Sequence, residues 1–224
     1  MKQTVVLFDI NETVLNLQML RPKFKDLFGD ENFMDTWFAM LLHTSTVSLV
    51  TSVKTDFGTL SRITLESLAS KLSVNVTNQK LDDVLNTFAS LPPHDDIKPA
   101  LAQLRSAGFK VVALSNSSQN LITKQITNAG LNEYFDEVIS VEEVNTFKPS
   151  FDAYKFASEK LKCDASDLRL VATHDWDTHG AMCAGLKAAY INRTGSIYNP
   201  LYRKTDINEL TMGAVVEQII LTDA

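Results

Sequence analysis

The stretch TVVLFDINETVL, residues 4–15, determines the fold that we expect for this chain of 224 residues. Residues 4–8 are mostly β-branched or aromatic and predict a short buried strand. The strand stops at Asp9, and polar residues follow at once. An Asp in this place can be a simple helix cap. It can also be part of a functional site at the carboxyl ends of the strands, where open α/β sheets bind ligands.

The chain then changes to a helical pattern without a convincing β run. Apolar residues recur at the spacing of an amphipathic helix, for example Trp37, Met40 and Leu41. The two prolines at 92–93 end this stretch, because paired prolines stop a helix. We therefore expect an all-helical insert over residues 16–92.

Short apolar strands and amphipathic helices alternate strictly in the rest of the chain. Strands are expected over residues 110–114, 137–140, 168–172 and 188–191, and helices over residues 99–107, 119–129, 151–161 and up to 184–185. This alternation implies a parallel sheet with helices on both faces. The predicted fold is α/β, with a Rossmann-like core formed by residues 1–15 and 93–224 and an inserted all-α cap domain that would cover the carboxyl ends of the strands.

The composition excludes several classes of protein. A net charge of −6 argues against a nucleic-acid-binding face, which needs clustered Lys and Arg. No stretch approaches the roughly 20 apolar residues of a membrane span. Cys163 and Cys183 have no metal-ligand spacing, and we expect them to be buried free thiols in a cytoplasmic protein. A small anionic partner remains possible, because a pocket can be basic inside an acidic protein.

Four groups of polar residues lie just beyond predicted strands or strand-like segments. They are Asp9, the pair Ser115 and Asn116, Lys148, and the cluster at 174–177. Each alone has a plain structural explanation, such as a helix cap or a solvated loop lysine. Their order and common placement are hard to explain as four independent caps, so we expect one site at the edge of the sheet.

These segments resemble the four motifs of the haloacid dehalogenase superfamily, in the same order. The matching segments are FDINETVL at 8–15, LSNSS at 114–118, FKPS at 147–150 and THDWDTHGA at 173–181. Within the superfamily, KPSFDAY at 148–154 and INRTG at 191–195 resemble the L-2-haloacid dehalogenases. The resemblance implies a hydrolase without metal or cofactor that displaces halide from a short 2-haloalkanoic acid.

The resemblance also implies roles for the residues. Asp9 would attack the carbon that carries the halogen and form an ester, which water then hydrolyses. Lys148 would offset the repulsion between Asp9 and the substrate carboxylate and lower the pKa of Asp9. Asp177 would orient or deprotonate the water, and Thr13 would donate to Asp9 or shape the turn. The candidates for substrate binding are Asn11, Phe38, Ser115, Asn116, Tyr154, His174 and Trp176.

Two departures from the family pattern keep other functions open. Phosphatases of the superfamily have a second Asp where this chain has Asn11, and a metal-binding Asp near the place of Thr173. A phosphatase of small phosphate esters is the second hypothesis, and Mg²⁺ is expected only under it. The dehalogenases hold the leaving halide with an Arg beside a Trp, whereas here Phe38 follows Trp37. A non-catalytic binding protein is the third hypothesis. The resemblance also leads us to expect a homodimer that pairs through the cap.

Overall fold

The computed structural model describes residues 4–224, so the first three residues of the predicted core segment 1–15 lie outside the described residues. Within that range, six parallel strands form one sheet in the order β3-β2-β1-β4-β5-β6. The strands are β1 (Val5–Phe8), β2 (Lys110–Ser115), β3 (Glu137–Ser140), β4 (Leu168–Ala172), β5 (Lys187–Ile191) and β6 (Ile207–Glu209). Because β1 lies between β2 and β4, the residue after it stands at the middle of the sheet's carboxyl edge.

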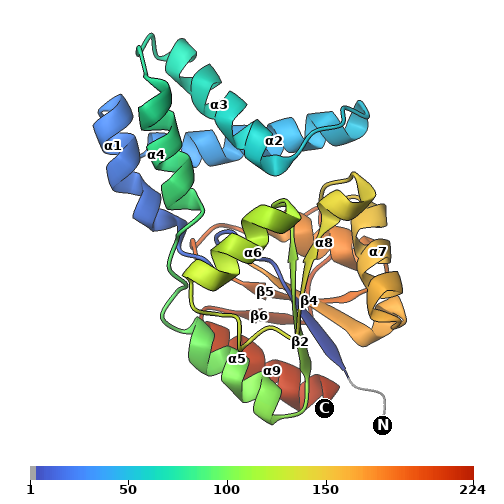
Figure 1. Cartoon of the computed structure of the whole chain (residues 1–224). Coiled ribbons are helices and arrows are strands. Elements are labelled where there is room, and N and C mark those ends of the chain that lie inside the picture. Colours follow the sequence, from blue (N-terminus) through green and yellow to red (C-terminus); the bar gives the residue numbers. More distant parts are fainter. Residues whose placement is uncertain (1–3) are drawn as a thin grey trace.

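Helices cover both faces of the sheet, as Figure 1 shows. They are α5 (Ile97–Ser106), α6 (Gln119–Asn128), α7 (Phe151–Leu161), α8 (Asp175–Cys183) and α9 (Met212–Asp223), with short 3₁₀ segments η2 (Val141–Val144) and η3 (Ala165–Asp167). Alternate residues of β1 face opposite sides, since Val6 and Phe8 pack with α5, α6 and α9, whereas Val5 and Leu7 pack with α7 and α8. The predicted α/β sheet with helices on both faces is confirmed.

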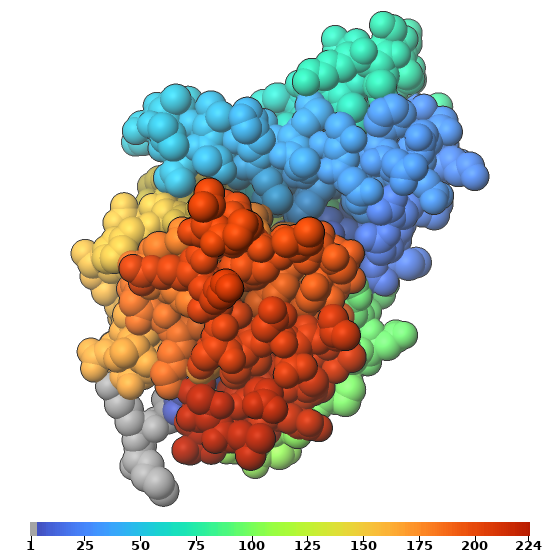
Figure 2. Space-filling view, turned by 180° about the vertical axis from the view of Figure 1, so that it is seen from behind, coloured from blue at the N-terminus to red at the C-terminus, as the bar shows by residue number. Residues whose placement is uncertain are grey.

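A group of helices stands between β1 and α5, and we call residues 17–88 the helical insert. It consists of η1 (Leu17–Leu20), α1 (Arg21–Phe28), α2 (Phe33–Val50), α3 (Phe57–Lys71) and α4 (Asn78–Phe88). Trp37 of α2 is fully buried at its centre, with ring centroids 5.4 Å from Phe24 and 5.6 Å from Phe88. Figures 1 and 2 show the insert as a separate layer above the sheet and its helices.

Two segments join the insert to the sheet, and they lie side by side. The amide of Asn16 donates to the carbonyl of Pro92 at 2.9 Å, and that of His94 donates to the carbonyl of Val14 at 3.0 Å. Leu15 also forms an antiparallel bridge with Pro93. The chain therefore leaves the sheet domain and returns to it through two adjacent segments that are hydrogen-bonded to each other.

The C-terminal part holds two elements beyond the last strand that the sequence pattern predicts. β6 has three residues, of which Ile207 alone is buried, so it is too short to show an alternating pattern. α9 buries Met212, Val215, Val216 and Ile219 at helical spacing, and this pattern is visible in the sequence.

The prediction of buried thiols is wrong. Cys163 and Cys183 are free, but Cys163 is only half-buried and Cys183 is exposed on α8. The helical period turns position 183 outward, a detail that residue type alone does not reveal. Among residues 4–224, no helix combines the length and the apolar character that a membrane crossing requires.

Candidate active site

Asp9 follows β1 directly, and the sheet itself fixes its backbone. Its amide donates to the carbonyl of Val171 on β4 at 3.0 Å, while its side chain is 7% exposed. The Thr13 hydroxyl donates to Asp9 Oδ2 at 2.6 Å and accepts a hydrogen bond from the Thr173 amide at 3.0 Å. Because that amide occupies a lone pair of the hydroxyl, the single proton of Thr13 is directed at Asp9.

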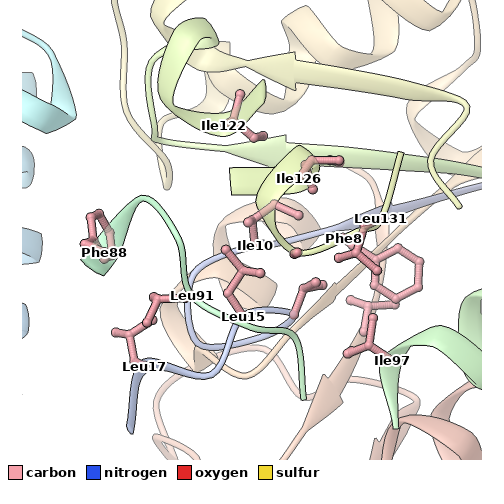
Figure 3. Packing of buried hydrophobic residues seen from close by; sticks show 14 of the residues in the cluster. Phe8, Ile10, Leu15, Leu17, Phe88, Leu91, Ile97, Ile122, Ile126 and Leu131 are labelled. Carbon is pink, nitrogen blue, oxygen red and sulfur yellow. The ribbon is translucent and has the colours of Figure 1, made fainter. Parts of the chain in front are cut away.

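The turn after Asp9 is held by apolar packing below the site. Ile10 and Leu15 belong to one buried cluster with Leu91 and with Ile122 and Ile126 of α6 (Figure 3). The tight turn is closed by the amide of Leu15, which donates to the carbonyl of Ile10 at 2.9 Å. The polar side chains of the turn are thus presented on a rigid base.

Lys148 is a buried cation between two carboxylates. Its Nζ lies 2.8 Å from Asp9 Oδ1 and 2.6 Å from Asp177 Oδ2, and it donates to the carbonyl of Leu114 at 3.1 Å. Burial alone would raise the pKa of Asp9, but Lys148 and His174 outweigh it and hold that pKa well below its usual 3.8. Asp9 is therefore ionised and desolvated, as a carboxylate nucleophile requires.

Asp177, in the first turn of α8, is held from two sides. Lys148 binds one carboxylate oxygen, and the Tyr154 hydroxyl donates to the other at 2.6 Å. Burial raises the pKa of Asp177, while Lys148 opposes that shift. The helix approaches so closely that a Cβ at Gly180 would lie 2.6 Å from Cβ of Pro149 and 2.8 Å from the Tyr154 oxygen. Only glycine fits there without a displacement, so Gly180 helps to bring Asp177 to the lysine.

Ser115 and Asn116 lie beneath Lys148 with their side chains engaged in protein contacts. Asn116 Oδ1 accepts a hydrogen bond from the Lys148 amide at 2.7 Å, and Ser115 Oγ accepts one from the Ser117 amide at 3.1 Å. Both side chains are buried. In this structure Asn116 therefore supports the backbone of Lys148, whereas Ser115 holds the loop after β2.

Asn11 is likewise engaged by the protein. Its Nδ2 donates to Ser117 Oγ at 3.1 Å, and its Oδ1 accepts from Gln125 Nε2 at 2.9 Å. The residue as a whole is 5% exposed. It ties the turn after β1 to the loop after β2 and to α6.

His174 stands on the other side of Asp9 and pairs with a residue that sequence reasoning missed, Glu12. Its Nε2 lies 2.8 Å from Glu12 Oε2, and its Nδ1 lies 3.2 Å from Asp9 Oδ2 without the alignment of a hydrogen bond. Burial would lower the pKa of His174, but Asp9 and Glu12 together raise it to about 10. Glu12 has a left-handed backbone with φ of 71°, which no sequence pattern indicates.

Aromatic residues enclose His174 in a pocket of about 290 Å³ between the insert and the sheet domain. Trp176 stacks on the imidazole, with centroids 5.1 Å apart and planes at 21°, and Phe38 of α2 lies 6.0 Å away on centroids. The structure thus brings together Phe38, His174 and Trp176 from elements far apart in the sequence. Other lining residues include Glu12, Asp35, Ala39, Leu42 and Thr173.

A second cavity, of about 370 Å³, opens on the lysine side of Trp176. Lys148 lines it together with Ala39 and Leu42 of α2 and with Tyr202. Trp176, Ala39 and Leu42 line both cavities, so the indole stands between them. We call the two cavities together the interdomain cleft.

Neither arginine of the insert lines the two cavities of this cleft. Phe38 occupies the expected place and contacts His174 instead. The two arginines of the insert are each paired with an aspartate of the insert, in the pairs Arg21–Asp35 and Arg62–Asp82.

Comparison with known sequences finds dehalogenases among the similar proteins. The (S)-2-haloacid dehalogenase of Pseudomonas sp. (strain YL) is 30% identical over 146 residues, which are 65% of this chain and 63% of that enzyme. Haloacetate dehalogenase H-2 of Moraxella sp. (strain B) is 28% identical over 161 residues, which are 69% of this chain and 72% of that enzyme. The match thus spans somewhat less than two thirds of the first two (S)-2-haloacid dehalogenases.

Comparison with solved structures supports the fold. The L-2-haloacid dehalogenase from Xanthobacter autotrophicus has a TM-score of 0.89 and 22% identity, with 100% of both chains covered. The structure of that protein with chloropropionic acid covalently bound gives the same values. The family model for haloacid dehalogenase-like hydrolases matches residues 4–169, from the strand before Asp9 into β4. The predicted superfamily is confirmed: this chain belongs to the haloacid dehalogenase-like hydrolases.

Proposed function

We propose that this chain is a metal-independent hydrolase that removes halide from short 2-haloalkanoic acids through an ester at Asp9. The observation that carries the proposal is the buried ammonium of Lys148, which bridges Asp9 and Asp177 at 2.8 and 2.6 Å. It keeps Asp9 ionised away from water, where a carboxylate is a better nucleophile. The dehalogenase names of the relatives and the covalent chloropropionic acid complex of the Xanthobacter protein support the same chemistry.

In the first step, Asp9 Oδ1 forms a bond to C2 of the substrate. The carbon–halogen bond breaks, and the halide leaves with the electron pair. Oδ1 is the attacking atom because, among the described residues, it has only Lys148 as a partner, whereas Oδ2 faces both Thr13 and His174. We propose that Phe38 and Trp176 form walls of the substrate pocket, and that backbone amides near Ser115 and Asn116 bind the substrate carboxylate.

In the second step, water adds to Cγ of Asp9 and gives a proton to Asp177. The bond between Cγ and Oδ1 then breaks, and the hydroxy acid leaves with Oδ1 as its new hydroxyl oxygen. Lys148 touches both Asp177 and Oδ1, so it is placed to give the departing alkoxide a proton and to regain one from Asp177. Tyr154 orients Asp177 and keeps its own proton, because burial raises its pKa well above 10.0.

The donor set argues against the phosphatase alternative. Lys148 and Tyr154 engage the two oxygens of Asp177, and a neighbouring ammonium repels a divalent cation. Among residues 4–224, no three His, Cys, Asp or Glu side chains form a group suited to a metal ion. A phosphoryl substrate would bring about two further negative charges to Asp9 without a matching Mg²⁺ site.

Halide release from 2-chloropropionate tests the proposal directly. We expect release from the wild type that EDTA does not reduce and that Asp9→Asn abolishes. One turnover in heavy-oxygen water should place the label in the Asp9 carboxylate. Release no greater than that of Asp9→Asn would refute dehalogenation. Turnover of p-nitrophenyl phosphate that EDTA abolishes would indicate a phosphatase, and ligand binding without either reaction would indicate a binding protein.

We also propose that residues 16–92 act as a cap over a core of residues 1–15 and 93–224, in a cytoplasmic protein whose free thiols suit a reducing compartment. A homodimer through the cap is supported by Val47, Val50 and Val53, which are 44%, 78% and 56% exposed at the end of α2 and just beyond it. Light scattering should give twice the monomer mass, and Val50→Glu should reduce it. A wild-type monomer at micromolar concentration would refute the dimer.

A further inference from the structure

We propose that His174 is a catalytic residue of ester hydrolysis: its Nδ1–H and the Thr13 hydroxyl stabilise the oxyanion at Asp9 Oδ2, and Glu12 is its positioning residue. This inference rests on the proposed ester at Asp9. It assigns the imidazolium to the second step rather than to the departing halide.

The positions of the hydrogen-bond donors around Asp9 indicate in which reaction step His174 acts. Lys148 holds Oδ1, which becomes the ester oxygen, and Oδ2 then becomes the carbonyl oxygen. Thr13 Oγ1 lies 2.6 Å from Oδ2 and His174 Nδ1 lies 3.2 Å from it. When water adds to Cγ, the π electrons of the carbonyl move to Oδ2, so the negative charge develops between these two donors.

His174 is also on the wrong side to bind the leaving group. In a displacement, the halide departs from the face of the carbon opposite the attacking oxygen. A donor within 3.2 Å of the nucleophile's own carboxylate lies on the near face. The imidazolium therefore acts on the carboxylate itself.

The second nitrogen of His174 keeps the ring charged and in place. Glu12 Oε2 lies 2.8 Å from Nε2, and the ring is stacked on Trp176. Nδ1 is buried and, within the part of the chain that the structure describes, has no aligned hydrogen-bond partner. Catalytic hydrogen bonds in unliganded sites are often poorly aligned and tighten later in the reaction. A buried donor of this kind is suited to an atom whose charge is still to form.

The backbone at Glu12 points to the same role. Its φ of 71° lies in the left-handed region, which costs energy for any residue with a Cβ. The chain nevertheless has a carboxylate there, and that carboxylate reaches His174, 162 positions later in the sequence. Strain of this kind is commonly retained at functional sites.

The charge on Asp9 changes during the reaction, so His174 should affect formation of the ester and its hydrolysis differently. Before the reaction, His174 stabilises the Asp9 anion, and this interaction is lost when Asp9 becomes an uncharged ester. Addition of water restores a negative charge next to the imidazolium, so the interaction is stronger in the transition state than in the ester. Removing His174 should therefore slow hydrolysis without slowing formation of the ester.

Rapid-quench mass spectrometry with 2-chloropropionate separates the two steps. His174→Phe keeps an aromatic ring beside Trp176 and removes the donor. We expect ester hydrolysis to fall by about 10²- to 10³-fold, so that the covalent adduct accumulates. His179→Phe is the matched control, because His179 lies on the same helix, stacked on Tyr202 away from Asp9. It should show no accumulation.

Glu12→Gln tests the positioning role while His174 stays in the chain. Removing the carboxylate lowers the pKa of His174, so hydrolysis should fall as pH rises through this lower pKa, with the adduct accumulating at alkaline pH only. The wild type keeps the Glu12 carboxylate beside Nε2 in the ester, so its hydrolysis should fall only at a higher pH than that of Glu12→Gln.

The outcomes separate this inference from the proposed function. A wild type that forms no adduct and releases no halide refutes the function, and the inference with it. A wild type that turns over, with His174→Phe either hydrolysing the ester at the normal rate or slowed in ester formation alone, refutes the role of His174.

Discussion

At the scale of single residues, the site is a row of alternating charges removed from water. Glu12, His174, Asp9, Lys148 and Asp177 follow one another at 2.8, 3.2, 2.8 and 2.6 Å. Each anion has a cation beside it, which offsets much of the cost of burial. The loss of one cation would leave carboxylates buried without compensation, so the row should respond to substitution as a unit.

Lys148→Met should show this coupling in the free energy of unfolding. We expect a loss of about 3–5 kcal/mol near neutral pH, because Asp9 and Asp177 would remain buried without their cation. The loss should shrink at about pH 5, where the unpaired carboxyl groups can take up a proton. Urea unfolding at both pH values measures it, with Asp9→Asn as the milder control. A loss that is the same at both values would contradict the coupling.

The raised pKa of His174 should make the free energy of unfolding depend on pH in the alkaline range. Its pKa is raised from 6.5 to about 10 in the folded chain, so its contribution is complete below pH 6.5 and is lost as pH rises toward 10. Asp9 has the opposite sign, since its lowered pKa stabilises the fold above 3.8 and the contribution is lost as pH falls. His174→Gln should lack the alkaline loss when unfolding is followed by urea across this range. Parallel curves for the two proteins would show that the imidazolium is not stabilising.

At the scale of elements, the strands and helices could be predicted where their signal is local. β3, β4 and α7 have the same bounds that the apolar runs predict. β6 could not be predicted, because one buried side chain in three residues carries no period. Its pairing with β5 crosses an irregular loop, and no local pattern in β6 itself indicates that pairing.

The functional site, too, could be predicted only in part from the sequence. Asp9 and Lys148 could be placed together, because polar residues after parallel strands meet at one edge of the sheet. Which side chain binds which could not be predicted. Asn116 binds the backbone of Lys148, and Glu12 binds His174, across 32 and 162 positions of sequence. Such pairs depend on rotamers and packing that no local pattern records.

Arg169 links the C-terminal elements to the sheet and has no part in the site. Its unexposed guanidinium binds Asp206 just before β6, at 2.6 Å, and Asp223 at the end of α9, at 2.5 Å. We expect Arg169→Leu to lower the free energy of unfolding by about 3 kcal/mol, because Asp223 stays buried and Lys187 is the one cation left beside it among residues 4–224. Activity below the melting range should be unchanged.

Thermal and urea unfolding of the Arg169→Leu protein measure this loss. The double variant Arg169→Leu/Asp223→Leu is the control, since removal of both partners should recover part of the stability. If the double variant is as unstable as the sum of the two single variants, the ion pair does not couple these elements.

At the scale of the whole molecule, the interdomain cleft belongs to neither part of the chain alone. α2 of the insert supplies Phe38, Ala39 and Leu42, and α8 of the sheet domain supplies His174, its N-cap, and Trp176. The two cavities of the interdomain cleft measure about 290 and 370 Å³. That space exceeds what a three-carbon acid fills, so under the proposed function the cleft has room for a longer chain on the substrate.

Ala39→Leu should test the use of this space, because Ala39 lines both cavities beside Trp176. The larger side chain reduces the volume for a long substituent, while Asp9 and Lys148 stay as they are. We expect kcat/KM for 2-chlorohexanoate to fall about tenfold and that for 2-chloropropionate to change little. The ratio of the two values, measured by halide release, cancels any general loss of active enzyme. An equal fall for both acids would mean that the cleft does not accommodate the substrate's chain.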